Sequence, residues 1–236
     1  MSYRRLPLST PQREIALRQI NDRKAVTPPA NLPFKTSTME QFDLLYPVFK
    51  EKVLNIGKTL SAQGGITTKV VKAKRVAQLH QLDFLDALQN AIRRGVFHES
   101  VRALYALPVE KRWRPKIQTE ADVLEWGENI HDGETKRIAL GGAPITFPSL
   151  AEVDAATNDF KTKNNQQSND KYAFDTAQEE LAAISKKADL LIRRCWNEIE
   201  TAFDDGDKPS MRRKARDWGV VYIETKKDKE PQDPRL

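Results

Sequence analysis

The stretch that decides the fold is residues 174–199, which read FDTAQEELAAISKKADLLIRRCWNEI. Its apolar residues recur at alternating spacings of three and four. This pattern averages close to ~3.5 residues, the period of helices that keep one seam against their neighbours. The pattern therefore predicts a long amphipathic helix in an all-α helical bundle. The seam consists of Phe174, Ala177, Leu181, Ile184, Ala188, Leu191, Cys195 and Ile199.

The first half of the chain carries comparable stripes. Apolar residues at helical spacing run through residues 42–60 and again through residues 71–92. Between them lies Gln63-Gly64-Gly65, and glycine is among the poorest helix formers. A short break between two striped helices predicts an antiparallel helical hairpin.

The two halves also share a residue pattern. Tyr105-Ala106-Leu107 follows the first pair of stripes, and Trp218-Gly219-Val220 follows the second. We therefore expect two tandem hairpins, related by a pseudo-twofold axis, that form one four-helix bundle. Chance is the alternative, because any two amphipathic helices can be slid into phase. The residues that repeat at an offset of 107 are Phe84, Leu85, Leu88, Asn90 and Ile92, with Leu191, Ile192, Cys195, Asn197 and Ile199.

The predicted organisation has three parts. Residues 1–36 form a basic, proline-rich arm, residues 37–225 form one helical-bundle domain, and residues 226–236 form a disordered tail. Val220-Val221-Tyr222-Ile223 is the one convincing β-type run, and it needs a partner strand near Phe147 or in another chain. Within the domain, hairpin one covers 37–107, a connecting segment with one added helix covers 108–148, and hairpin two covers 149–225.

The positive charge is concentrated at the start of the sequence. The whole chain has a formal net charge of +6, whereas seven basic and two acidic side chains give residues 1–35 alone a charge of +5. A basic arm on a nearly neutral body predicts contact with an acidic partner, such as nucleic acid, another protein or a membrane surface. The alternative is a solvated terminal extension.

A second basic segment surrounds Trp113, which lies between Arg112 and Arg114. Arginine beside an exposed aromatic ring can stack on bases or grip phosphates. The same residues can instead pack against the bundle, with the tryptophan as an anchor, and we favour that interpretation. The candidate partner-binding residues are Arg4, Arg5, Arg13, Arg18, Arg112, Trp113 and Arg114.

No arrangement of residues in the sequence indicates catalysis. The histidines His80, His98 and His131 are dispersed, and the single cysteine, Cys195, falls on the apolar seam as a core thiol. Glu128 and His131 have the local spacing of a di-metal bundle helix, but no second copy of that motif exists. We therefore expect no catalytic residues, no metal site and no cofactor, and we expect that the protein is not an enzyme.

The sequence offers no sign of export or of a membrane span. No apolar core follows the basic start of the chain, as a secretory signal would require. No stretch approaches the ~18 apolar residues of a transmembrane helix. We expect a cytoplasmic protein without membrane contact.

Several short motifs resemble those of an uncharacterised family of bacterial helical-bundle proteins. The similarity spans most of the chain, and the motifs are structural in character. The resemblance implies a helical fold, and it supplies no catalytic residue because no activity is established for that family. The motifs are Tyr3-Arg4-Arg5-Leu6-Pro7, Glu125-Trp126-Gly127-Glu128, Gly141-Gly142 with Pro144-Ile145-Thr146, Trp196-Asn197-Glu198, and Trp218-Gly219-Val220-Val221-Tyr222.

These observations lead to one functional hypothesis with two alternatives. The first is a non-enzymatic interaction or scaffold protein that self-associates or docks into a larger assembly, with another protein or a second copy as its partner. The second is a nucleic-acid- or ribosome-associated protein that uses the basic arm. An enzyme with a site in the bundle core is a distant third.

Overall fold

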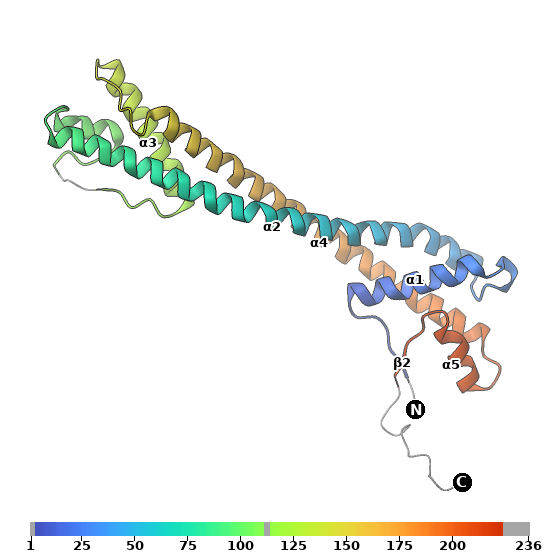
Figure 1. The fold of residues 1–236 in the computed structure, drawn as a ribbon. Coiled ribbons are helices and arrows are strands. Elements are labelled where there is room, and N and C mark those ends of the chain that lie inside the picture. The colour runs from blue at the N-terminus through green and yellow to red at the C-terminus, as the bar shows by residue number, and fades with distance from the viewer. Residues whose placement is uncertain (1–2, 111–113, 224–236) are drawn as a thin grey trace, which may run out of the picture. The chain divides into compact units, whose positions relative to one another are not determined.

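The computed structural model describes residues 3–110 and 114–223, and most of them are helical (Figure 1). This confirms the all-α class. The larger helices are α1 (Thr10–Val26), α2 (Thr36–Arg93), α3 (Glu120–Ala139), α4 (Leu150–Ala202) and α5 (Lys208–Arg216). The shorter elements are the 3₁₀ helices η1 (Pro29–Asn31) and η2 (Glu99–Tyr105) and the strands β1 (Tyr3–Arg4) and β2 (Tyr222–Ile223).

The expected turn at Gly64-Gly65 is wrong, because α2 continues through both glycines as one helix of 58 residues. Neither glycine has a positive φ. The residues that follow, Ile66 and Val70, are buried in the core. Burying such side chains stabilises the fold by more than the roughly 1 kcal/mol that each glycine costs inside a helix. The helix therefore continues through the glycine pair. Likewise, α4 runs unbroken for 53 residues, through the polar stretch 164–170.

The chain divides into two compact units, and each long helix contributes to both. Unit 1 comprises residues 3–58 and 174–223 of the described chain, and unit 2 comprises residues 59–110 and 114–173. Two continuous helices thus replace the two hairpins expected from the sequence. The expected boundaries of the arm, the bundle domain and the tail stay predictions.

In unit 1, the first part of α2 runs antiparallel to the last part of α4. Thr38 Oγ1 donates to Glu198 Oε1 over 2.8 Å, and Lys52 Nζ pairs with Glu180 over 2.9 Å. The strands pair antiparallel, with Tyr3 opposite Ile223. The partner of the β-type run is therefore the start of the chain, not the region of Phe147. The seam residues confirm their expected role, since Ala177, Ala188, Leu191, Cys195 and Ile199 are all buried.

Unit 2 is built from the last part of α2, η2, α3 and the first part of α4. The buried Gln81 side chain links three of these segments, since its Nε2 donates to Val123 O over 2.8 Å and to Thr157 Oγ1 over 3.0 Å. The apolar core gathers around Phe84, Leu88 and Phe160.

A buried polar network also stabilises unit 2. Glu134 is completely buried and accepts hydrogen bonds from Arg137 Nη2 over 2.7 Å, from the amide of Ile145 over 2.8 Å and from the hydroxyl of Tyr105. Burial pushes the pKa of Glu134 upward, but the hydrogen bonds from Arg137, Tyr105 and Ile145 outweigh it and lower the pKa. Gly133 leaves space for the Tyr105 ring, because a Cβ there would lie 2.4 Å from Tyr105 Cδ1.

The internal repeat inferred from the sequence has a detailed structural counterpart. The Tyr105-Ala106-Leu107 and Trp218-Gly219-Val220 triplets each end a short helix, with the central residue in the left-handed region at φ 55° and 87°. Leu107 N bonds Arg102 O over 3.0 Å, and Val220 N bonds Ala215 O over 3.2 Å. Arg102 and Ala215 are therefore equivalent positions. The α1 and α3 helices match as well, because capping boxes start both of them, at Ser9 and Thr119.

Candidate functional site: an apolar cleft beside the N-terminal arm

The basic residues of the arm are largely engaged with acidic side chains of unit 1. Arg4 pairs with Glu200 over 2.8 Å, and Arg13 forms a two-pronged pair with Asp189 over 2.7 and 2.9 Å. Hydrogen bonding to Asp189 raises the pKa of Arg13. Further pairs join Arg23 to Asp217 and Lys24 to Asp43. Much of the positive charge that suggested a nucleic-acid partner is therefore already balanced.

The other predicted partner-binding residues do not form one surface. Arg5 and Arg18 belong to unit 1, where both are exposed. Arg114 belongs to unit 2 and pairs with Asp86 over 3.3 Å. Arg112 and Trp113 lie outside the described residues. Of the predicted partner-binding residues that the structure describes in unit 1, Arg5 is the one that lines a cavity.

That cavity is a cleft of about 270 Å³, here called the arm cleft. Three elements form it: the chain on either side of β1 and β2, the outer face of α1, and the last part of α4. Its walls are mostly apolar, with polar groups at Arg5, Gln12 and Gln19. The lining residues are Arg5, Leu6, Pro7, Gln12, Ile15, Ala16, Gln19, Trp196, Gly219, Val221 and Ile223.

Local backbone features fix the walls of the arm cleft. The amide of Arg5 donates to Val221 O over 2.9 Å, which extends the strand pairing. The Ser9–Gln12 capping box sets where α1 begins. Gly219 has φ 87° and lies close to the Gln19 side chain. A Cβ added at residue 219 would come within 2.7 Å of Gln19 Oε1. A glycine is therefore required at this wall.

Trp196 lines the arm cleft and carries an unsatisfied polar group. Its side chain is only 1% exposed, and within residues 3–110 and 114–223 no acceptor bonds its buried Nε1–H. An unpaired buried donor costs on the order of 1–3 kcal/mol. Since most buried polar groups in proteins are paired, this donor is an unusual feature of unit 1, and its nitrogen is itself closed to solvent.

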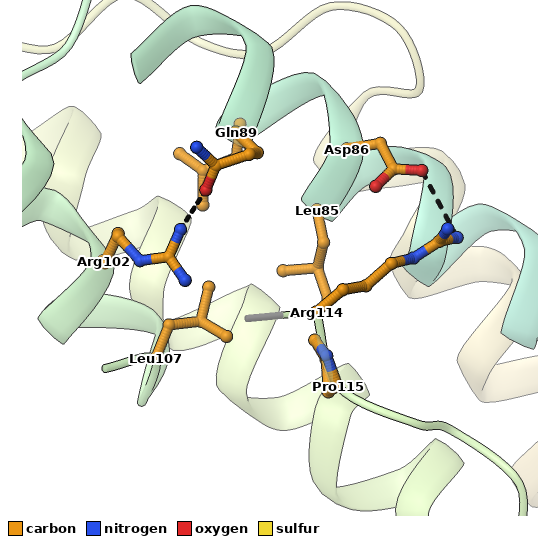
Figure 2. A pocket seen from close by; sticks show the side chains of 8 residues that line it. Leu85, Asp86, Gln89, Arg102, Leu107, Arg114 and Pro115 are labelled. Atoms are coloured by element: carbon orange, nitrogen blue, oxygen red, sulfur yellow. Dashed lines mark hydrogen bonds and ion pairs between the residues drawn. The ribbon is translucent and has the colours of Figure 1, made fainter. Parts of the chain in front are cut away.

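Unit 2 contains a smaller cavity. It measures about 50 Å³ and is lined by residues of α2, η2 and the segment before α3. Figure 2 shows Arg102 reaching toward Gln89, and Arg114 reaching toward Asp86 beside Pro115. At the offset of 107, Gln89 is the counterpart of Trp196.

A buried arginine forms part of the wall of this smaller cavity. Arg102 is buried and its guanidinium donates to Gln89 Oε1 and, over 2.7 Å, to Pro108 O. Burial lowers the pKa of this guanidinium. Its counterpart in unit 1 is the buried Ala215, which does not line the arm cleft.

The sequence analysis did not identify most of this site. Leu6, Ile15, Trp196 and Val221 come from distant parts of the chain, and none carries a chemical motif. No local pattern in the sequence brings these residues together.

A second hollow, of about 230 Å³, lies in unit 2 between α3 and α4. There His131 Nδ1 lies 2.9 Å from Asp154 Oδ2, and Glu128, Asp132 and Lys161 add charged groups. No group of three or more His, Cys, Asp or Glu side chains in the described parts of the chain is placed to hold a metal ion. None of the helices described here is long and apolar enough to cross a bilayer.

Comparison with known proteins gives one partial similarity. The chain is 27% identical over 125 residues to lipoyl synthase 2 of Prochlorococcus marinus (strain MIT 9313), an alignment that covers 48% of this chain and 39% of that protein. The chain thus spans about two fifths of the length of the curated protein it matches. No family model and no solved structure matches it.

This similarity corrects one expectation. The absence of catalytic motifs led us to expect that the protein is not an enzyme, and that expectation is wrong, because the protein it matches is an enzyme by name. The match is too distant and too partial to assign an activity to this chain.

Proposed function

We propose that this chain is an interaction protein that docks a partner protein through the arm cleft of unit 1. The observation that carries the proposal is the open, largely apolar cleft itself, with the exposed side chains of Ile15 and Val221 in its walls. The partner inserts an apolar side chain between these walls.

The composition of the cleft supports a protein partner. Buried apolar anchors contribute much of the affinity at protein interfaces, and here Leu6, Ile15 and Val221 offer such a surface beside a polar rim. Ile15 is 45% exposed and Val221 48% exposed, so covering them removes apolar area from water. The basic arm contributes by forming one wall of the cleft.

The test uses short peptides as probes. Capped tripeptides, acetylated and amidated, with leucine, aspartate or lysine at the centre are titrated into the full chain labelled with ¹⁵N. The indole N–H signals of the four tryptophans are followed, and Trp196→Phe assigns the signal of interest. We expect the leucine peptide to shift the Trp196 signal and the charged peptides to leave it unchanged.

Matched variants make the test specific to the cleft. Ile15→Glu places a charge in the lining and is expected to abolish the shift. Val26→Glu is the control, since Val26 is an exposed residue of the same helix that does not line the cleft. If no apolar peptide moves the Trp196 signal of the folded protein, the proposed function is wrong.

A further inference from the structure

Unit 2 carries a positively charged face on α2, whose residues do not line the arm cleft. Residues 59–82 contain Lys69, Lys72, Lys74 and Arg75 and no aspartate or glutamate. The side chains of Lys69, Lys72 and Arg75 are exposed and are here called the basic face. We propose that the basic face binds the phosphate backbone of duplex DNA without reading its base sequence. This inference goes beyond the proposed function and does not depend on it.

The charges of the basic face are not balanced within the protein. No carboxylate in the described parts of the chain lies within 4.0 Å of a charged nitrogen of this face. In the arm, by contrast, Arg4 pairs with Glu200 and Arg13 with Asp189. Like charges on neighbouring turns of a helix repel each other, so an unbalanced row of cations favours an anionic partner.

Lys74 belongs to a different side of α2, the one that packs against the segment around the start of α3. Its side chain is half-buried. Four and seven residues further along the helix, Gln78 donates to Ile117 O over 2.9 Å and Gln81 donates to Val123 O over 2.8 Å. Residues at these spacings share one side of a helix. The basic face therefore consists of three cations, and this number sets the salt dependence expected below.

The spacing of the three cations suits a row of phosphates. They recur every three residues, so Lys69 and Arg75 are separated by about 9 Å along the helix axis. One strand of duplex DNA carries a phosphate about every 3.4 Å along its axis. The opposite side of α2 is buried through Ile66 and Val70, so the helix can only lie against the backbone. Contacts of this kind position a protein but carry no sequence information.

The composition of residues 59–82 favours duplex DNA over other polyanions. The segment contains no phenylalanine, tryptophan or tyrosine, the rings on which the bases of single strands stack. The lysines and the arginine of the basic face only donate hydrogen bonds, so they cannot accept one from the 2′-hydroxyl that distinguishes RNA. The apolar side of this part of α2 lies in the core of unit 2, where it is not available for insertion into lipid.

The experiment measures binding of the full chain to a labelled DNA duplex of mixed sequence by fluorescence anisotropy at several salt concentrations. With three phosphate contacts, the slope of log K against log salt is about −2.7. We therefore expect the affinity to fall about 40-fold between about 50 and 200 mM salt. Lys72→Gln should reduce this fall to about 12-fold, since one contact is lost.

Matched triple variants make the test specific to the basic face. Lys69→Gln with Lys72→Gln and Arg75→Gln should abolish binding. The control removes the same charge from exposed residues of α4, where acidic residues are interleaved, and should leave the affinity unchanged. It combines Lys186→Gln, Lys187→Gln and Arg193→Gln. Far-ultraviolet circular dichroism verifies that both variants keep their helices.

Loss of duplex binding in the first triple variant and not in the control supports the inference. Equal binding by the two variants overturns it, and so does the absence of any binding at the lowest salt concentration. Tighter binding of a single strand, of duplex RNA, of polyglutamate or of phosphatidylserine vesicles also overturns it, because each assigns the face to another partner. Ile15→Glu, which tests the arm cleft, should leave the affinity for DNA unchanged, so this inference and the proposed function fail separately.

Discussion

The guanidinium of Arg102 donates a hydrogen bond to the amide oxygen of Gln89, and both residues line the small cavity of unit 2. Arg102→Ala removes this bond and the 2.7 Å bond to Pro108 O. We expect the free energy of unfolding to fall by about 2 kcal/mol, the typical loss for hydrogen bonds to a charged group. Urea denaturation followed by circular dichroism measures the change.

Arg114→Ala is the matched control for this prediction. Arg114 lines the same cavity, but its ion pair with Asp86 is about half exposed on both sides. Exposed ion pairs contribute between about 0 and 1 kcal/mol. Equal losses in the two variants would contradict the view that the buried hydrogen bonds of Arg102 stabilise unit 2 more than the exposed ion pair of Arg114 does.

Replacing a glycine inside α2 is expected to increase stability, whereas the substitution of Arg102 decreases it. A Cβ at Gly64 meets nothing within 4 Å, and its backbone is helical. Gly64→Ala should therefore raise the free energy of unfolding by about 1 kcal/mol, because alanine loses less conformational entropy in a helix. Gly95→Ala is the control, since that site is equally open but has φ 74°. We expect it to lower the melting temperature, which calorimetry measures for both variants.

Gly64 also shows which feature of the fold the sequence alone did not predict, namely the continuation of α2. The seam from Phe174 to Ile199 predicted the buried face of α4, because helical periodicity is a local property. Whether a helix ends at a glycine pair depends instead on tertiary packing. Ile66 and Val70 are buried against other parts of unit 2, and no local pattern reveals this.

The candidate site was harder to predict for the same reason. Leu6, Trp196 and Val221 meet only because β1 pairs with β2, a contact between the two ends of the described chain. The basic residues of the arm drew attention by their charge, yet Arg4 and Arg13 are bound to acidic residues far away in the sequence.

The buried pair of Glu134 and Arg137 gives the largest expected effect. Glu134→Gln leaves a guanidinium that is 3% exposed without its carboxylate. Breaking a buried pair in this way costs about 3–5 kcal/mol. Replacing both residues, in Glu134→Met with Arg137→Met, should recover part of the loss, because no buried charge then remains. A double-mutant cycle by urea denaturation measures the coupling.

The same pair makes stability depend on pH. The pKa of Glu134 is lowered in the folded state, so its contribution is fully present above its ordinary value of 4.5. This contribution is lost as the pH falls below that value. Denaturation curves between pH 7 and pH 3 should show a loss that is smaller in Glu134→Gln. Parallel curves for the two proteins would mean that this carboxylate is not held by the network.

Cys195 should be chemically inert in the folded protein, although it is the only thiol in the chain. Burial, reinforced by Glu198, raises its pKa to about 12, and the thiolate is the reactive form. We expect iodoacetamide at pH 8 to modify the urea-unfolded chain quickly and the native chain very slowly, as mass spectrometry would show.

The raised pKa of Cys195 also means that stability declines as the pH rises from about 9 toward 12, since only the unfolded chain then ionises freely. The decline should be smaller in Cys195→Ala but not absent, since the pKa values of Tyr105 and Tyr222 are raised as well. Fast alkylation of the native protein would contradict a core position for the seam.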